Sequence, residues 1–276
     1  HVPASGYHAR MFSYRHAFHA GNHADVLKHM TLIAVIRHLM LKPTGLTMID
    51  THAGAGLYRL AGDYARTRGA AGDGILRMTM RAPGSAGAVG AASLAPALQN
   101  YVDTVRAFNP GTSIKIYPGS PFIIQRLLRP HDKLKLFELH PADMHALEGN
   151  IGQLAVGRQV AVMCEDGFEG IKKFLPPPAR RALLLCDPSY EMKSDYGRVL
   201  DMVPDALKRF ATGTYAVWYP IIARPEAHDL PRRLKTMAKK AKQALKVKSK
   251  SKKNNSDEKQ QVFVLDFDFY FSLLIQ

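Results

Sequence analysis

The sequence predicts an α/β fold in which a parallel sheet is covered by helices. Short apolar runs that are typical of buried strands recur along the chain, and the segments between them carry helix-like apolar spacing. Several of these runs end at an acidic residue or a glycine-rich turn. The predicted strands cover residues 46–49, 134–138, 160–163, 182–186 and 214–219.

Helices are predicted between these strands. Apolar residues recur at helical spacing from Asp25 to Met40, before the first strand. Residues 60–108 interrupt the α/β alternation, with a break rich in Gly, Ala and Ser at 82–93 and a helical pattern at 94–108. We interpret 60–108 as a helical insertion. A further helix is predicted for residues 141–151, with Pro141 in its first turn.

The chain of 276 residues is long enough for one α/β domain with an insertion. We expect a domain at 11–235, preceded by a leader or tag remnant at 1–10. No apolar run reaches the ~18 residues of a membrane span, and no secretory segment is recognised. Cys164 and Cys186 lie in apolar runs, which is typical of reduced core thiols in a cytoplasmic protein, so neither a disulfide nor a zinc site is expected.

The net charge of +15 is distributed unevenly. Residues 232–260 contain 12 Lys/Arg and 2 acids, whereas residues 1–231 contain 26 Lys/Arg and 19 acids. We therefore expect residues 236–276 to form a basic tail, either disordered or a frayed helix, followed by a possible edge strand. This tail is either a solvated segment or a nonspecific contact for RNA phosphates.

A glycine-rich turn follows the first predicted strand, in the sequence Asp50-Thr-His-Ala-Gly-Ala-Gly56. Glycines in such a turn allow the backbone to approach a nucleotide-like cofactor closely. The motif lacks the third glycine of the dinucleotide fingerprint, and an acid before the loop would repel a pyrophosphate. It therefore favours S-adenosylmethionine over NAD, with a purely structural turn as the alternative.

A second motif, Asp187-Pro-Ser-Tyr190, follows the apolar run 182–186. An acid, a proline and an aromatic residue at a strand exit can hold the exocyclic amine of a base for methyl transfer. Asp187 and a backbone carbonyl would accept the amine hydrogens, and Tyr190 would stack on the base. Asp-Pro also commonly just ends a strand. The two motifs together favour a methyltransferase.

Acidic residues lie at the carboxyl ends of four predicted strands, where ligands bind in parallel sheets. They are Asp50, Glu138, Asp166 and Asp187. Glu138 is placed to accept hydrogen bonds from ribose hydroxyls, and Asp166 from the adenine amine of the cofactor. Both residues could instead be N-caps of the following helices. Ser120 is expected either to cap a helix or to contact the cofactor.

The segment 13–25 is rich in histidine and includes Tyr14, Arg15, His16 and His19. These residue types stack on bases or contact phosphates. Zinc binding by His16, His19 and a further histidine at position 23 is disfavoured, because no cysteine is near and Gly21-Asn22 would break the helix. The segment is interpreted as a substrate-binding arm, with an ordinary surface cap as the alternative.

With these residues assembled, the chain resembles the bacterial 23S rRNA adenine-N6 methyltransferase family. The resemblance covers about residues 11–235. The string at 13–29, Ser-Tyr-Arg-His-Ala-Phe-His-Ala-Gly-Asn-His-Ala-Asp-Val-Leu-Lys-His, is long enough to be highly specific. The other matching strings lie at 50–56, 117–121, 138–141, 166–168 and 210–216.

The resemblance implies a Rossmann-like S-adenosylmethionine-dependent methyltransferase core with an inserted helical subdomain. It also implies a monomer that acts on one adenine of 23S rRNA, as deproteinised RNA or an early precursor. Asp187, Tyr190 and Lys28 would be catalytic, and Tyr14 and His16 would bind the substrate adenosine. S-adenosylmethionine would contact His29, His52, Ser120, Glu138, Asp166, Gly167 and Asp187.

Two features depart from the family pattern. Ser189 stands where amino-methyltransferases usually have a second proline. Beyond about residue 235 the family continues with further strands, whereas this chain becomes lysine-rich and ends in an alternating apolar run at 262–271. That run is either an edge strand or an altered end that exposes apolar surface. The rival hypotheses are a DNA-adenine or protein-glutamine methyltransferase, an RNA-binding homologue without catalysis, and a dehydrogenase.

Overall fold

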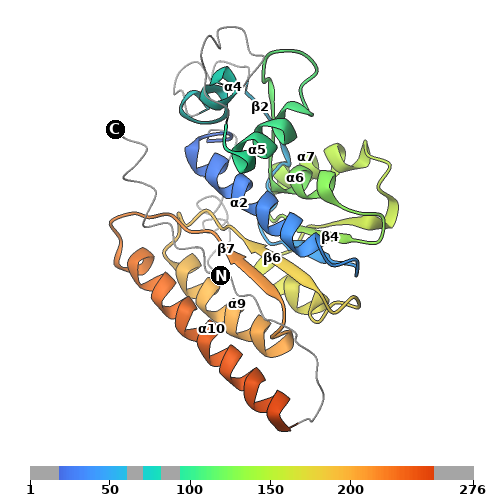
Figure 1. Cartoon of the computed structure of the whole chain (residues 1–276). Coiled ribbons are helices and arrows are strands. Elements are labelled where there is room, and N and C mark those ends of the chain that lie inside the picture. The colour runs from blue at the N-terminus through green and yellow to red at the C-terminus, as the bar shows by residue number, and fades with distance from the viewer. Residues whose placement is uncertain (1–18, 61–70, 82–93, 252–276) are drawn as a thin grey trace, which may run out of the picture. The chain divides into compact units, whose positions relative to one another are not determined.

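The computed structural model describes residues 19–60, 71–81 and 94–251 (Figure 1). Their contacts divide the chain into two compact units. We call the first the helical unit; it comprises His1–Pro43, Ala53–His131 and His140–Val162. The second, the sheet unit, comprises Thr44–His52, Asp132–Leu139 and Met163–Gln276. The predicted leader, Tyr14, His16 and the apolar run at 262–271 lie outside the described residues.

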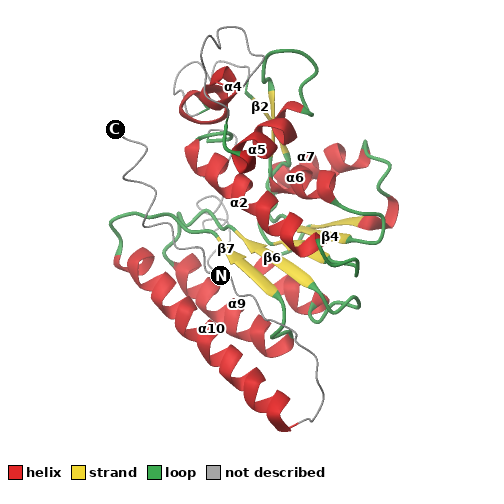
Figure 2. Ribbon diagram, viewed as in Figure 1, coloured by secondary structure: helices red, strands yellow, loops and turns green. Residues whose placement is uncertain are grey.

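A parallel sheet with the strand order β5-β4-β1-β6-β7 organises the fold (Figure 2). β1 pairs in parallel with β4 and β6, and β6 pairs in parallel with β7, which confirms the predicted sheet. The last residue of β5 is hydrogen-bonded to the residue after β4, since the Glu138 N–H donates to the Met163 carbonyl oxygen at 3.2 Å. The strands are β1 (Thr47–Asp50), β4 (Lys133–Phe137), β5 (Val160–Met163), β6 (Ala182–Cys186) and β7 (Thr214–Val217).

Burial explains why these segments are strands. Every residue of β1, β6 and β7 is buried, so a continuous apolar run is needed instead of the alternation seen in one-sided sheets. At the amino end of β1 the buried carboxylate of Asp132 accepts a hydrogen bond from the Leu46 N–H at 2.8 Å. The register then places Asp50, the last residue of β1, opposite Leu136 of β4 and Leu185 of β6.

Four helical segments share one hydrophobic core with the sheet. They are α8 (Gly167–Gly170), η4 (Ile171–Phe174), α9 (Ser194–Arg209) and α10 (Pro225–Ser251). Sheet residues such as Ile49, Leu184 and Tyr215 contribute to this core together with Val203 of α9 and Leu230 of α10. α9 and α10 pack against each other along their lengths (Figure 1).

The basic run beyond residue 235 is helical where the structure describes it. α10 crosses the expected boundary at 235 without a break and continues to Ser251. Of the two alternatives for the tail, the structure therefore shows a helix over this range, whereas residues 252–276 lie outside the described part of the chain. The domain boundary itself stays a prediction.

The helical unit has a separate hydrophobic core, to which Val26, Tyr101 and Tyr117 contribute. Helices appear where the sequence predicted them, and the first begins at His23 because the Asn22 side chain accepts a hydrogen bond from the Asp25 N–H. The short antiparallel pair β2–β3 was not predicted. The elements are α2 (His23–Met40), β2 (Leu57–Arg59), η2 (Gly72–Leu76), α4 (Arg77–Arg81), α5 (Pro96–Arg106), β3 (Ile116–Pro118), α6 (Ser120–Leu127), α7 (Pro141–Gly152) and η3 (Gly157–Gln159).

Two expectations were wrong. Cys164 was expected to be a core thiol like Cys186, but it lies just after β5 and is exposed, whereas Cys186 is fully buried. Of the two alternatives for Ser120, helix capping is wrong, because Gly119 occupies the N-cap of α6 and Ser120 is the first helical residue. Contact with a cofactor stays a prediction. Within the described ranges, no helix has both the length and the apolar character that a membrane crossing requires.

We predict that Gly170→Ala destabilises the sheet unit. A Cβ at position 170 would lie 2.2 Å from a ring carbon of the buried Phe137, so the core must shift. The free energy of unfolding should fall by about 1–3 kcal/mol in urea titrations. Gly197→Ala is the matched control, because nothing lies within 4 Å of its Cβ, and it should raise stability by about 0.5–1 kcal/mol. Equal effects of the two substitutions would contradict the packing argument.

Candidate cofactor and catalytic site

Four acidic side chains lie at the carboxyl edge of the sheet, as the sequence predicted. Asp50 ends β1, Glu138 follows β4, Asp166 follows β5 and Asp187 follows β6. Asp50 is fully buried, whereas the other three are partly exposed. All four belong to the sheet unit, and the parallel pairing brings the strand ends that carry them to one edge.

The turn after β1 is tied to the end of β6 through Thr51. Its N–H and its hydroxyl both donate to the Leu185 carbonyl oxygen, at 3.0 and 3.2 Å. The Thr51 hydroxyl oxygen is also 2.7 Å from Nδ1 of His52. When the hydroxyl donates to Leu185, His52 must carry its proton on Nδ1, which leaves Nε2 as an acceptor. The His52 N–H donates to Asp50 Oδ1 at 3.3 Å.

His52 is uncharged at neutral pH. Burial lowers its pKa to about 4, although the negative charges of Asp187 and Asp166 act in the opposite direction. The positive charge of Arg198 adds to the lowering of the pKa. A neutral imidazole between acidic groups acts as a hydrogen-bonding group and contributes no positive charge to the edge of the sheet.

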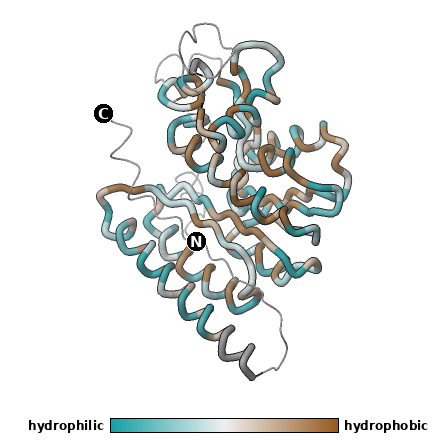
Figure 3. The backbone as a smooth tube through the Cα atoms, in the orientation of Figure 1, coloured by the Kyte–Doolittle hydropathy of each residue, from teal (hydrophilic) through white to brown (hydrophobic). Residues whose placement is uncertain are grey.

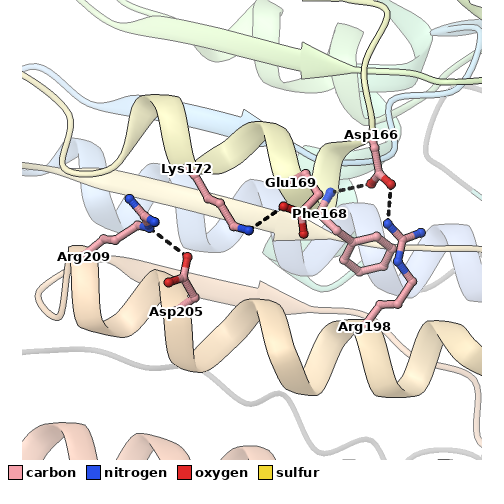
Figure 4. A network of polar contacts seen from close by, with 7 residues as sticks. All are labelled: Asp166, Phe168, Glu169, Lys172, Arg198, Asp205 and Arg209. Atoms are coloured by element: carbon pink, nitrogen blue, oxygen red, sulfur yellow. Dashed lines mark hydrogen bonds and ion pairs between the residues drawn. The ribbon is translucent and has the colours of Figure 1, made fainter.

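The turn after β5 is organised by Asp166, which caps α8. One carboxylate oxygen accepts a hydrogen bond from the Phe168 N–H at 3.0 Å, and the other is paired with Arg198 of α9 (Figure 4). The same guanidinium lies over the Phe168 ring, 4.2 Å from its centroid. The alternative that Asp166 is an N-cap is therefore confirmed, whereas Glu138 is not a cap, because His140 occupies the N-cap of α7.

Phe168 and Gly167 bring the turns after β5 and β1 together. The Phe168 ring meets His52 edge to face, with 4.8 Å between the ring centroids. A Cβ at position 167 would lie 2.0 Å from the Thr51 carbonyl oxygen, so only glycine allows this approach. Gly167 is thus required by packing, whether or not it also contacts a cofactor.

Tyr190 anchors the loop 187–190, which we call the Asp187 loop, to the rest of the sheet unit. Tyr190 has a positive φ of 55° and is 3% exposed. Its hydroxyl donates to the Trp218 carbonyl oxygen at 2.9 Å, and its ring lies 4.7 Å from that of Tyr196. Arg224 donates to the Tyr190 carbonyl oxygen at 3.1 Å. These contacts give Tyr190 a structural role that the sequence did not predict, and stacking on a base stays a prediction.

Within the same loop, Asp187 is partly exposed, Pro188 is buried and Ser189 is exposed. The Trp218 N–H donates to the Cys186 carbonyl oxygen at 2.9 Å, which extends the β6–β7 ladder up to the residue before Asp187. The carboxylate is therefore presented at the end of a fully buried, hydrogen-bonded strand.

Three expected site residues, Lys28, His29 and Ser120, belong to the helical unit. The Lys28 ammonium lies 2.9 Å from Asp25, and both side chains are almost completely buried. His29 Nδ1 is 2.7 Å from the Tyr117 hydroxyl, where burial raises the pKa of the phenol and keeps it neutral. The roles of these three residues stay predictions, as do those of Tyr14 and His16 outside the described residues.

The glycine-rich turn of the helical unit has a conformational reason for its composition. Gly54 and Gly56 have φ values of 62° and 80°, in the left-handed region that favours glycine. A Cβ at position 56 would also lie 2.8 Å from the ring of Phe122. The structural interpretation of the motif is thus supported, and close approach of a cofactor remains a separate prediction.

Comparison with known proteins identifies the family. The model of the family described as "Ribosomal RNA large subunit methyltransferase D, RlmJ" matches residues 43–262. The chain belongs to this methyltransferase family. The match confirms the resemblance seen in the sequence, and it extends beyond residue 235, through most of the basic region.

Curated relatives and a solved structure agree with this family. Two proteins named ribosomal RNA large subunit methyltransferase J, from Escherichia coli and Haemophilus influenzae, are 42% and 41% identical to this chain. The alignments cover 80% and 78% of this chain and 75% and 73% of the relatives. A crystal structure of a Legionella pneumophila protein of family DUF519 is similar with a TM-score of 0.70, at 31% identity over 79% of this chain and 76% of that one.

Arg198 is a residue of the candidate site that sequence reasoning missed. It contacts both Asp166 and Phe168, yet it lies 32 residues after Asp166, in the second turn of an amphipathic helix. Nothing in its local sequence separates it from a surface arginine. Thr51 was also missed, because its side-chain partner lies on a strand that is distant in sequence.

We predict that His52 makes stability depend on pH between about 4 and 6.5. In this window the unfolded chain binds a proton that the folded chain excludes, so the free energy of unfolding falls as the pH is lowered. Above pH 6.5 the histidine is neutral in both states, and below it the free energy of unfolding should fall by up to about 1.4 kcal/mol per pH unit. The measurement is urea unfolding at several pH values for the parent, His52→Gln and the control His228→Gln, which removes an exposed histidine. Parallel curves for all three proteins would refute the prediction.

Proposed function

We propose that this family member transfers a methyl group from S-adenosylmethionine to the N6 amine of one adenine in 23S rRNA. The observation that carries the proposal is the position of Asp187 at the end of β6, within a family of ribosomal RNA methyltransferases. The relatives' names supply the RNA class. The adenine and its N6 amine are inferred from the Asp187-Pro-Ser-Tyr190 motif and from the family resemblance in the sequence.

Asp187 fits the requirements of amine methylation. The N6 amine of adenine is nearly nonbasic, so catalysis depends on orientation and charge stabilisation more than on a strong base. The partly exposed carboxylate would accept one amine hydrogen and take up that proton as the new N–C bond replaces the donor's S–C bond. A strand-end carbonyl oxygen would accept the other hydrogen. This pair of acceptors would direct the nitrogen lone pair in line with the bond between the donor's sulfur and methyl group. Pro188, which is buried, limits the backbone freedom of the loop.

The residues of the sheet unit fit the proposed donor. Glu138 is partly exposed and can accept hydrogen bonds from ribose hydroxyls. The Asp166 carboxylate already accepts from the Phe168 N–H and from Arg198, but a carboxylate has about four lone-pair sites, which leaves room for an adenine amine. We assign His52 and Gly167 to the same cofactor site. His29 and Ser120 of the helical unit are assigned by the family resemblance.

The substrate side is assigned by resemblance and by chemistry. Tyr14 and His16 would contact the target adenosine, together with Lys28. Tyr190 would contribute by holding the Asp187 loop, and by stacking only if its ring leaves the core. We expect a monomeric, cytoplasmic enzyme that prefers deproteinised or early-precursor 23S rRNA. Methylation of DNA adenine or of a protein glutamine by the same chemistry is the alternative that product analysis separates.

Arg198 is predicted to position Asp166 for the methyl donor. Arg198→Gln should raise the KM for S-adenosylmethionine by roughly tenfold, which corresponds to about 1.4 kcal/mol, while kcat changes less. Arg209→Gln is the matched control, because Arg209 lies on the same helix and pairs with Asp205 at the surface (Figure 4). Arg198→Lys should recover only part of the affinity, since lysine cannot keep both contacts. Equal KM values for the Arg198→Gln and Arg209→Gln variants would rule out the positioning role.

The deciding experiment is transfer of a labelled methyl group from S-adenosylmethionine to unmodified, deproteinised 23S rRNA, with nucleoside analysis of the product. A single N6-methyladenosine is expected. Asp187→Asn should lower kcat by at least about 100-fold, because an amide neither carries the charge nor accepts as strongly. Its melting temperature should change little, because the side chain is partly exposed at the end of the strand.

The neighbouring exposed residue provides the control, since Ser189→Ala should retain activity. Full activity of Asp187→Asn would refute the assigned mechanism. Methyl transfer by the parent protein to DNA or to a glutamine side chain, and not to rRNA, would refute the assigned substrate.

A further inference from the structure

α10 has an apolar side that packs against the hydrophobic core of the sheet unit. Ala227, Leu230 and Leu234 are buried in the core, and Met237 and Ala241 pack against it. These positions recur every three or four residues, so they form one side of the helix. The opposite side faces away from the core.

Charge on α10 is strongly unbalanced. The helix contains nine Lys/Arg residues and two acids, a difference of +7, and no acid occurs after Asp229. Both acids already have cationic partners, since Glu226 lies 3.7 Å from Lys193 and Asp229 pairs with Arg232. The neighbouring helix α9 contains three Lys/Arg residues and three acids, a difference of zero. Of these two packed helices, only α10 carries a net positive charge.

Four of these cations form a stripe on the side of α10 opposite the core. They are Arg232, Lys235, Lys239 and Lys242, and all four are exposed. Their spacing of three, four and three residues places them on one helix side, about 15 Å from first to last at 1.5 Å per residue. Figure 3 shows hydrophilic residues recurring along this helix. We call these four residues the basic stripe.

We propose that the basic stripe binds the phosphate backbone of the RNA substrate and so docks RNA on the sheet unit. This inference rests on the proposed function for the class of partner. A row of cations at regular spacing complements a regularly charged polyanion. A membrane surface fits less well, because the apolar residues of α10 are buried against the core, and no large exposed apolar residue occurs on the helix through residue 244.

The test compares two variants with the same change in charge. The stripe variant carries Lys235→Gln, Lys239→Gln and Lys242→Gln. The control variant carries Lys172→Gln, Lys208→Gln and Arg209→Gln, which lie elsewhere on the sheet unit near acidic residues such as Glu169 and Asp205. Glutamine retains helix propensity, so α10 should remain folded. Circular dichroism and melting temperature would check this for both variants.

RNA affinity is measured by fluorescence anisotropy with a labelled 23S rRNA fragment, without S-adenosylmethionine, over a range of salt concentrations. Removing three phosphate contacts should lower the slope of log K against log salt by about 2 for the stripe variant. The control variant should keep most of the parent's slope. In methyl transfer, the stripe variant should show a higher KM for RNA and an unchanged kcat at saturating RNA.

Equal slopes for the two variants would overturn the proposal, as would a stripe variant that loses binding to phosphatidylserine vesicles and keeps its RNA affinity. Failure of the proposed function is recognised separately. In that case the unmodified protein would transfer no methyl group to rRNA, whereas the binding slopes would still report whether the stripe contacts RNA phosphates.

Discussion

The double hydrogen bond from Thr51 to the Leu185 carbonyl oxygen is the interaction on which the candidate site depends. It fixes the turn after β1 against the end of β6. The positions of His52 and Asp187, which follow these two neighbouring strands, are therefore fixed relative to each other. The Thr51 carbonyl oxygen, in turn, leaves space only for a glycine at position 167. One short turn therefore sets the positions of the β1, β5 and β6 exits. A substitution there would disturb three strand ends together.

The sheet and its acidic edge could be predicted from sequence because burial on both faces forces continuous apolar runs, and because such runs end where polar side chains begin. The contacts of Tyr190 could not. A tyrosine after Asp-Pro-Ser has the same local pattern whether its ring faces a ligand or the core. Only the fold shows the Trp218 carbonyl within reach of its hydroxyl. Arg198 was missed for the same reason, since its partners are distant in sequence.

Predictions of helix N-caps were only partly correct. Ser120 has the side chain of a good cap, but the extended backbone that an N-cap requires falls on Gly119. Glu138 and Asp166 looked equivalent in sequence, yet only Asp166 immediately precedes its helix. His140 caps α7 instead, which leaves the Glu138 carboxylate without a capping role. Local geometry at the scale of one residue decides these roles, and sequence pattern does not resolve it.

On the proposed function, the charges at the sheet edge suit transfer of a methyl group from a cationic donor. A sulfonium loses its positive charge as the methyl leaves, so a site that binds the cation too strongly would slow the step. Asp166 and Asp187 supply negative charge, and Arg198 offsets part of it through Asp166. His52 adds no further positive charge, because burial keeps it neutral. On the proposed function, the pairing with Arg198 therefore distinguishes Asp166, which would bind the donor, from Asp187, which would hold the amine.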